Sequence, residues 1–154
     1  MVIADVPSIS SAPLDILELK HRRRDSILAQ MTAAASSSGA VRHAEVLAAA
    51  LARSERAAGS ALGKGVALPQ ARSIAVVRPH VVLGRSTRGV DWNAPDGAPV
   101  HLVVLVLSPA AMSPARHLER VARAAHALRS QRNRQKLAEA DAPAARTILE
   151  GQPA

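Results

Sequence analysis

The sequence contains no cysteine, which excludes disulfide bonds and thiolate metal ligands. Aromatic residues are nearly absent, since Trp92 is the only one and there is no tyrosine or phenylalanine. Single-stranded nucleic acid would therefore find no stacking platform. No apolar run reaches the roughly 18 residues of a membrane span, and the first residues lack a basic-then-apolar signal pattern. We expect a cytoplasmic protein without membrane insertion.

The charge is strongly of one sign: the 154 residues carry a net +8 at pH 7, largely from arginine. A basic protein can contact nucleic-acid phosphates, so a nucleic-acid-binding module is one hypothesis. Solvated arginines, or a surface that meets an acidic partner, account for the same charge, and we favour these explanations. We interpret the basic run near the C-terminus as a solvated helix face; it comprises Arg116, Arg120, Arg123, Arg129, Arg132, Arg134 and Lys136.

Hydrophobic periodicity indicates an α/β fold in one domain, 14–150, after a flexible polar lead, 1–13. The patterns predict strands at 14–19, 66–68, 81–84 and 100–107, and a turn-rich connector at 89–99. They predict helices at 24–35, 41–57, 113–128, 131–140 and 143–149, with Val46, Leu47, Leu51, Leu118, Val121, Ala125 and Leu128 facing inward. The segment 100–107 is almost wholly apolar, as an inner strand covered on both faces would be. We therefore predict a mixed sheet with helices on both faces.

The most informative stretch is Ser60 to Arg72, which reads SALGKGVALPQAR. Gly63 and Gly65 allow a tight loop because glycine adopts positive φ without steric cost. A short buried strand follows, and proline stops its extension. Gln70 is therefore presented by a rigid turn at the end of a strand, where open α/β sheets place their working residues.

This stretch resembles the phosphorylation-site segment of the mannitol/fructose-type enzyme IIA domains of the bacterial phosphotransferase system, a group that includes a nitrogen-regulatory branch. The family pattern is roughly G-x-G-[VI]-A-[IL]-P-H-[AG], and this chain matches it except that Gln70 replaces the phosphate-accepting histidine. A second segment, DGAPVHLVVLVLSP at 96–109, is similar to the family's D-G-x-P-V-D-L-V-F-L-L-x-x-P. Downstream, His117 matches the second active-site histidine. The resemblance covers about residues 14–150 and implies the fold of this family.

The resemblance implies specific chemistry that Gln70 cannot perform. In the family, a phosphocarrier protein transfers a phosphoryl group to the first histidine, whose neutral ring nitrogen is a nucleophile. A glutamine amide neither titrates nor offers a free nitrogen lone pair, although it forms hydrogen bonds. We therefore expect a degenerate, regulatory, partner-binding protein rather than an active phosphotransferase component. The alternatives are an active carrier that uses another histidine, a site repurposed for a ligand, and an engineered substitution.

The remaining candidate residues follow from the matched positions. The resemblance implies that His117 helps to bind phosphate and that Ser60 and Arg72 serve phosphate or partner binding, although a surface ion pair explains Arg72 equally well. Ala61 stands where the family usually has threonine. His80, His101 and His126 lack metal-ligand spacing, so we expect structural roles and no metal; His101 as a substitute phosphate acceptor is a minor alternative. We expect no cofactor. Partners implied by the family are a phosphocarrier protein or regulated kinases and transporters.

Overall fold

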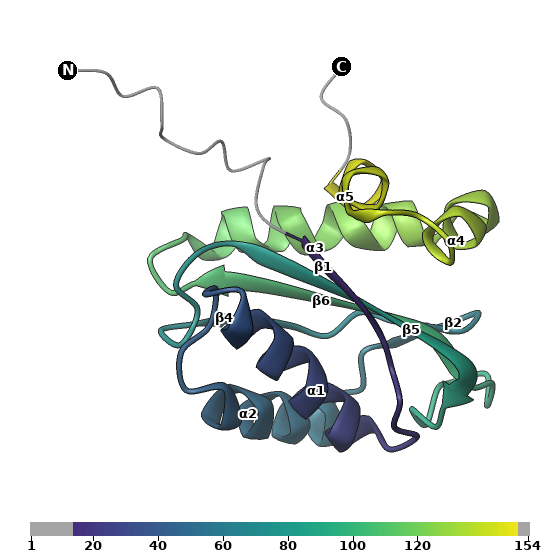
Figure 1. Cartoon of the computed structure of the whole chain (residues 1–154), viewed down its shortest axis with the longest axis horizontal. Helices are drawn as coiled ribbons and strands as arrows, with labels where there is room; N and C mark the ends of the chain where they lie inside the picture. The colour runs from purple at the N-terminus through teal and green to yellow at the C-terminus, as the bar shows by residue number, and fades with distance from the viewer. Residues whose placement is uncertain (1–13, 151–154) are drawn as a thin grey trace.

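The computed structural model of the chain describes residues 14–150, so the predicted flexible lead at 1–13 lies outside the described residues. Within these described residues, six strands and five helices follow one another (Figure 1). In order they are β1 (Leu14–Glu18), α1 (Arg24–Ser37), α2 (Ala44–Ala57), β2 (Ala61–Gly63), β3 (Val66–Ala67), β4 (Gln70–Ser73), β5 (His80–Val90), β6 (Val100–Pro109), α3 (Pro114–Leu128), α4 (Gln131–Leu137) and α5 (Ala142–Glu150).

Strand β6 organises the sheet, whose order is β1-β5-β6-β3-β2, with β4 also paired to β6. β6 is antiparallel to β5 and parallel to both β3 and β4, and β1 is parallel to β5. The sheet is therefore mixed, as predicted. The short strands β3 and β4 occupy successive parts of the same edge of β6, because Ala67 pairs with Val103 and Gln70 pairs with Val106.

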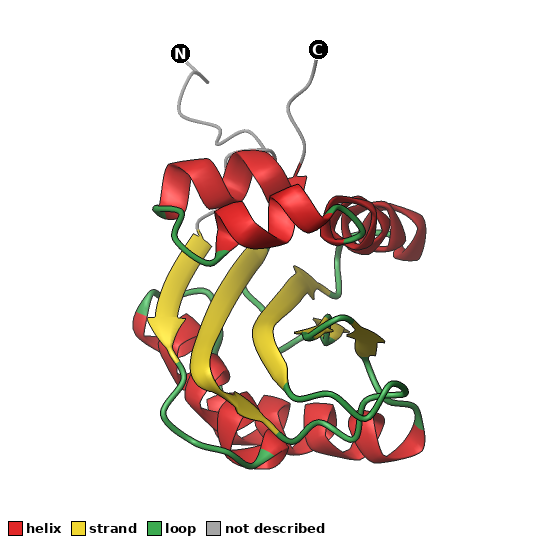
Figure 2. Cartoon of the chain, turned by 90° about the vertical axis from the view of Figure 1, so that its right-hand side faces the viewer, coloured by secondary structure: helices red, strands yellow, loops and turns green. Residues whose placement is uncertain are grey.

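Helices cover both faces of the sheet, with α1 and α2 on one side and α3, α4 and α5 on the other (Figures 1 and 2). Successive side chains of a strand point to opposite faces. In β6, Val103, Leu105 and Leu107 accordingly join the core formed with α1 and α2, whereas Val104 and Val106 join the core formed with α3, α4 and α5. This double burial explains why the 100–107 segment is apolar without alternation.

Several predicted details are wrong. Val46 and Leu118 do not face inward, because each is 61% exposed, whereas α2 buries Leu47 and Leu51 as predicted. α2 begins at Ala44 rather than at residue 41, because Val41 forms a bridge to Val76 in an extended segment. The connector predicted to begin at residue 89 begins after Val90, the end of β5. Strands β2 and β4 were not predicted.

Candidate functional site

Two adjoining parts of the fold bring Gln70 and His117 together. Gln70 is the first residue of β4 and lies opposite Val106 in the parallel pairing with β6. Pro69, buried and immediately before it, fixes the direction in which the chain enters β4. After β6, Ser113 caps α3 by accepting a hydrogen bond from the Arg116 backbone N–H at 3.2 Å. His117 therefore lies in the first turn of α3, beside the strand that holds residue 70.

A chain of hydrogen bonds passes through this site. His117 Nε2 lies 2.5 Å from Gln70 Oε1, and His117 Nδ1 lies 2.7 Å from Ser108 Oγ. Because the amide oxygen can only accept, Nε2 carries the hydrogen and Nδ1 accepts from the serine hydroxyl. Arg120 Nη1 donates to Ser108 Oγ at 2.6 Å. The imidazole is thus held in one tautomer by partners on both of its nitrogens.

The surroundings keep His117 neutral. Burial lowers the pKa of His117 below its ordinary value, and the positive charges of Arg120 and Arg72 lower it further. The residue is only 5% exposed, whereas Gln70 is exposed at the mouth of the site. A neutral imidazole that donates outward to the amide and accepts from Ser108 is therefore the form present at neutral pH.

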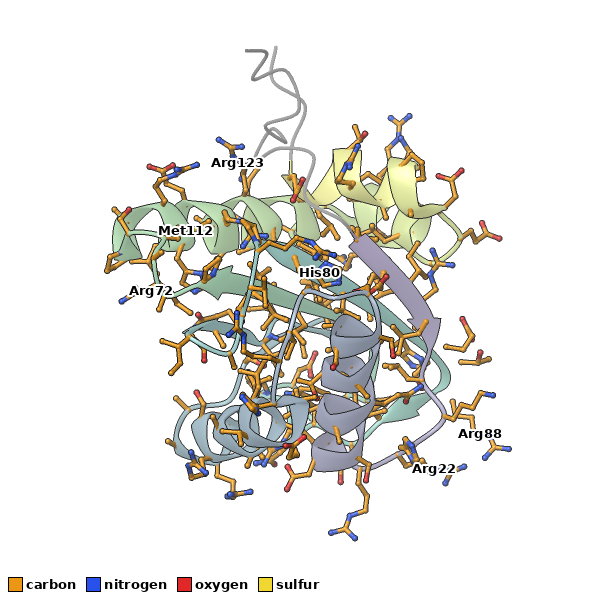
Figure 3. The ribbon with its side chains drawn as sticks, turned by 60° about the vertical axis from the view of Figure 1, so that its left-hand side comes forward. Arg22, Arg72, His80, Arg88, Met112 and Arg123 are labelled. Atoms are coloured by element: carbon orange, nitrogen blue, oxygen red, sulfur yellow. The ribbon has the colours of Figure 1, made fainter. Side chains whose placement is uncertain are left out.

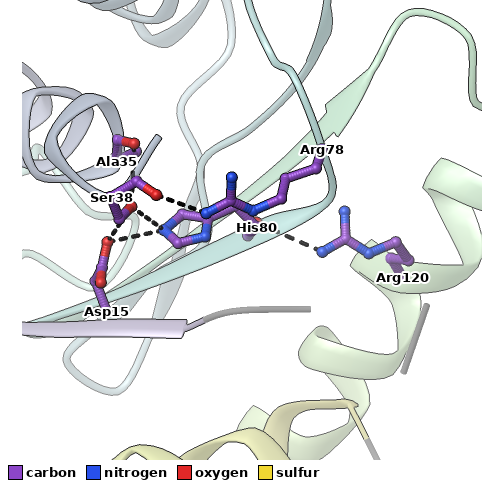
Figure 4. A network of polar contacts seen from close by, with 6 residues as sticks. All are labelled: Asp15, Ala35, Ser38, Arg78, His80 and Arg120. Atoms are coloured by element: carbon purple, nitrogen blue, oxygen red, sulfur yellow. Dashed lines mark hydrogen bonds and ion pairs between the residues drawn. The ribbon is translucent and has the colours of Figure 1, made fainter. Parts of the chain in front are cut away.

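Arg120 holds the inner end of the site, a role that sequence reasoning missed. Its guanidinium donates to the backbone oxygen of Leu107 at 2.6 Å as well as to Ser108. It also reaches the backbone oxygen of His80 at 3.4 Å (Figure 4). The prediction of a solvated helix face is therefore wrong for Arg120. The available signal was its position three residues after His117, which puts both side chains on the same side of α3.

Arg72 lies at the outer side of the site, at the end of β4. Its Nη1 donates to the backbone oxygens of Ala110 at 2.6 Å and of Met112 at 3.1 Å. These bonds tie β4 to the loop that leads into α3. Figure 3 labels Arg72 and Met112 at this place. The surface ion pair considered for Arg72 is replaced by bonds to main-chain oxygens, so the guanidinium charge stays available beside the imidazole.

Ser60 belongs to a different cluster. Its backbone N–H donates to Glu55 Oε2 at 2.9 Å, and its hydroxyl donates to the other carboxylate oxygen. Trp92 Nε1 donates to the same carboxylate at 3.2 Å. The hydrogen bonds described for Ser60 thus tie it to Glu55 and Leu68, and among residues 14–150 none links it to Gln70 or His117. Glu55 is only 5% exposed although it is a charged residue of α2, and no local pattern in the sequence marks it as buried.

The other candidate histidines lie apart from this pair. His80 is fully buried, with Nε2 2.8 Å from Asp15 Oδ2 (Figure 4); burial lowers its pKa, opposed by Asp15. His101 is exposed at the start of β6, and its Nδ1 lies 2.8 Å from the Ser86 backbone oxygen. His126 is exposed on α3. Within residues 14–150, no three metal-ligating side chains gather at one point, and none of the described helices is long and apolar enough to span a membrane.

The arrangement defines what the site can do chemically. It presents an exposed amide, a neutral imidazole behind it and two guanidinium groups at its sides, so it can attract an anion and exchange hydrogen bonds with a docked group. Residue 70 itself supplies no nucleophile, because the amide nitrogen shares its lone pair with the carbonyl.

The chain belongs to the family described as "Phosphoenolpyruvate-dependent sugar phosphotransferase system, EIIA 2", whose model matches residues 14–150. It is 29% identical over 141 residues to the fructose-specific EIIA component of Haloferax volcanii, covering 92% of this chain and 91% of that protein. It is 26% identical over 125 residues to the fructose-specific EIIABC component of Bacillus subtilis. That match covers 81% of this chain but spans only 20% of the longer relative.

Solved structures agree on the fold. The nitrogen regulatory protein IIA-Ntr from Neisseria meningitidis superposes with a TM-score of 0.73 at 25% identity, covering 92% of this chain and 94% of that one. The Escherichia coli enzyme IIAMtl, solved in complex with phosphorylated enzyme IIBMtl, superposes with a TM-score of 0.71 at 18% identity, covering 90% and 94%. The mixed sheet with helices on both faces is therefore the mannitol and nitrogen-regulatory IIA fold.

Proposed function

We propose that this family member is a regulatory, partner-binding protein that carries no phosphoryl group at residue 70. The observation that supports this function is the amide of Gln70, which lies 2.5 Å from His117 Nε2 at the mouth of the site. The family resemblance assigns that position to the phosphate-accepting histidine. Transfer needs a nucleophile in line with phosphorus, and an amide in contact with the second histidine provides none.

The rest of the site is compatible with recognition of a partner. The positive charges of Arg72 and Arg120 lie close enough to His117 to lower its pKa, after the larger effect of burial. A phosphorylated or acidic partner would be attracted to this charge. Hydrogen bonds to Ser108 and Gln70 fix His117 in one neutral tautomer. The site therefore presents one defined arrangement of donors and acceptors to a partner. A phosphoryl group is therefore a feature that the site would recognise on a partner rather than carry.

Exposed apolar side chains next to the site in the sequence support docking of a protein. Leu118 directly follows His117 and is 61% exposed, and Ile74 directly follows β4 and is 85% exposed. Large apolar residues exposed beside a functional site favour a protein-contact surface. Partners of the kind implied by the family are a phosphocarrier protein, an enzyme IIB-like domain, or regulated kinases and transporters.

One observation favours a second candidate, an active carrier that uses His101. The Ser86 carbonyl can only accept, so the contact at 2.8 Å places the hydrogen of His101 on Nδ1. Nε2 then keeps its lone pair, as a nucleophile requires, and the ring is exposed. His101 lies five residues before Val106, the partner of Gln70 in β6. A phosphocarrier protein that transfers its phosphoryl group to His101 would therefore have to dock near the start of β6, away from Gln70.

The test is phosphorylation with phosphoenolpyruvate, enzyme I and the phosphocarrier protein, read by intact mass. We expect no added phosphoryl group on the wild type and one on Gln70→His, because the surrounding site is preserved. His101→Gln is the matched control for the second candidate. Phosphorylation of the wild type that His101→Gln abolishes would establish the second candidate and refute the first. Binding of the unphosphorylated chain to the phosphocarrier, measured by titration, tests partner recognition separately.

A further inference from the structure

A cavity of about 390 Å³ lies between α3, α5 and the sheet, and Arg120 is among the residues that line it. Its floor is apolar and includes Val104, Val106 and Leu149, all nearly fully buried. Arg116, Glu119 and Arg123 on α3 and Glu150 at the end of α5 also line it. A volume of this size is at the lower end of ligand pockets, which run from about 300 to 1,000 Å³. The cavity is therefore sized for a small molecule with an apolar body.

Glu150 offers an unpaired hydrogen-bond acceptor to a ligand in this cavity. Its Oε2 is buried and has no hydrogen-bond partner among the described residues. A buried polar atom without a partner is costly, so a ligand that donates to it gains that interaction. The Arg123 guanidinium is adjacent, because its Nη1 donates to the Glu150 backbone oxygen at 3.2 Å. An acceptor and a cationic donor thus lie side by side above an apolar floor.

We propose that this cavity binds an aliphatic α-amino acid. The ammonium group donates to the Glu150 carboxylate, the carboxylate group pairs with Arg123, and the aliphatic side chain lies on the floor formed by the valines of β6 and Leu149. An α-amino acid fits because its two charged groups sit on one carbon, matching the adjacency of Arg123 and residue 150. A simple anion would leave the Glu150 oxygen unmet, and a simple cation would face the surplus of arginines.

A ligand bound in the cavity would affect the candidate functional site through Arg120. Its side chain lines the cavity and donates to Ser108 Oγ at 2.6 Å, and Ser108 contacts His117 Nδ1 at 2.7 Å. A ligand that draws the guanidinium toward the cavity weakens the bond to Ser108 and changes the field at the imidazole. The cavity is therefore an effector site, coupled to the surface that the proposed function uses but not dependent on that function.

The probes are L-leucine and L-valine, titrated into the full chain by calorimetry. Two controls each remove one charged group from leucine: 4-methylpentanoate lacks the ammonium and 3-methylbutylamine lacks the carboxylate. We expect saturable binding of at least one amino acid and at least about tenfold weaker binding of both controls, since each loses a charge-assisted hydrogen bond. Absence of binding by both amino acids overturns the proposal, as does equal binding of either control.

Two variants test whether the amino acid binds in this cavity. Ala124→Leu fills the space beside the floor and Glu150→Gln removes the charge that receives the ammonium; we expect each to weaken binding about tenfold or more. Arg132→Gln, at an exposed position of α4 that does not line the cavity, is the matched control and keeps wild-type affinity. Circular dichroism checks that each variant is folded. Wild-type affinity in both cavity variants would overturn the assignment, and unchanged His117 ring resonances on saturation would overturn the coupling.

Discussion

Replacing Ser108 by alanine removes the link between Arg120 and His117. Ser108 is fully buried, and its hydroxyl is the hydrogen-bond partner of His117 Nδ1, at 2.7 Å. Arg120 keeps a bond from the same Nη1 to the Leu107 backbone oxygen, so this nitrogen still has an acceptor. The imidazole has no such replacement, because Nδ1 is left as a buried acceptor without a donor. The cost of such an orphaned group is about 1–3 kcal/mol.

This loss is large enough to measure. A domain of this size shifts its melting temperature by about 2–4 °C per kcal/mol, so Ser108→Ala should melt about 4–8 °C lower for a loss of about 2 kcal/mol. Urea unfolding followed by circular dichroism gives the free energy, and the nitrogen resonances of His117 report the tautomer. We expect the ring to lose its single-tautomer signature.

Ser113→Ala is the matched control, because it also removes one serine hydroxyl near the start of α3. As the N-cap, Ser113 stabilises the helix by about 1 kcal/mol, but its hydroxyl accepts from the Arg116 backbone N–H and makes no described bond to the His117 imidazole. The control should therefore lower stability without changing the imidazole resonances. A Ser108→Ala protein that is within about 0.5 kcal/mol of wild type, with unchanged His117 resonances, would refute the hydrogen-bond chain.

Three further predictions concern buried polar groups and glycine. The free energy of unfolding should fall as the pH drops below 6.5, the ordinary pKa of His80, and should fall less steeply in His80→Gln. Glu55→Gln should cost about 1–3 kcal/mol in urea unfolding and change the Trp92 fluorescence emission, because the carboxylate accepts from the indole. Gly89→Ala should cost more than about 1 kcal/mol, because φ is +89° and a Cβ would lie 2.7 Å from Pro99 Cβ.

The direction in which stability changes with pH follows from the lowered pKa of His80. Between the folded value and 6.5 the unfolded chain binds more protons, so stability is present at higher pH and is lost as the pH falls. An equal slope in wild type and His80→Gln would contradict this. For Glu55→Gln, unaltered Trp92 emission would count against the buried bond. Gly97→Ala controls for Gly89→Ala, since φ is +72° but nothing lies within 4 Å of its Cβ; equal losses would remove the steric explanation.

The sequence predicted the elements whose patterns are long or whose caps are explicit. The apolar run of β6 and the Ser113–Pro114 start of α3 are of this kind, and both were placed within two residues. Strands β2 and β4 were missed because they are three and four residues long and carry no alternating apolar pattern. Their pairing is decided by the neighbouring strand β6 rather than by local propensity.

The candidate site was predictable where it rests on motif positions and not where it rests on tertiary contacts. Gln70 and His117 were identified from the family pattern, and the structure brings them into contact. Arg120 and Ser108 were missed because an arginine on a helix and a serine at a strand end have no distinguishing local pattern. Leu118 was placed inward because it fits the helical period of the apolar residues, yet the inward position in that turn is taken by His117.

The most direct measurement is the intact mass of two proteins, the wild type and Gln70→His, after incubation with phosphoenolpyruvate, enzyme I and the phosphocarrier protein. The account predicts an unchanged mass for the wild type and the addition of one phosphoryl group to the variant, lost on mild acid treatment as a phosphohistidine would be. A phosphorylated wild type, or a folded Gln70→His protein that stays unmodified while a family relative is phosphorylated in the same mixture, would contradict it.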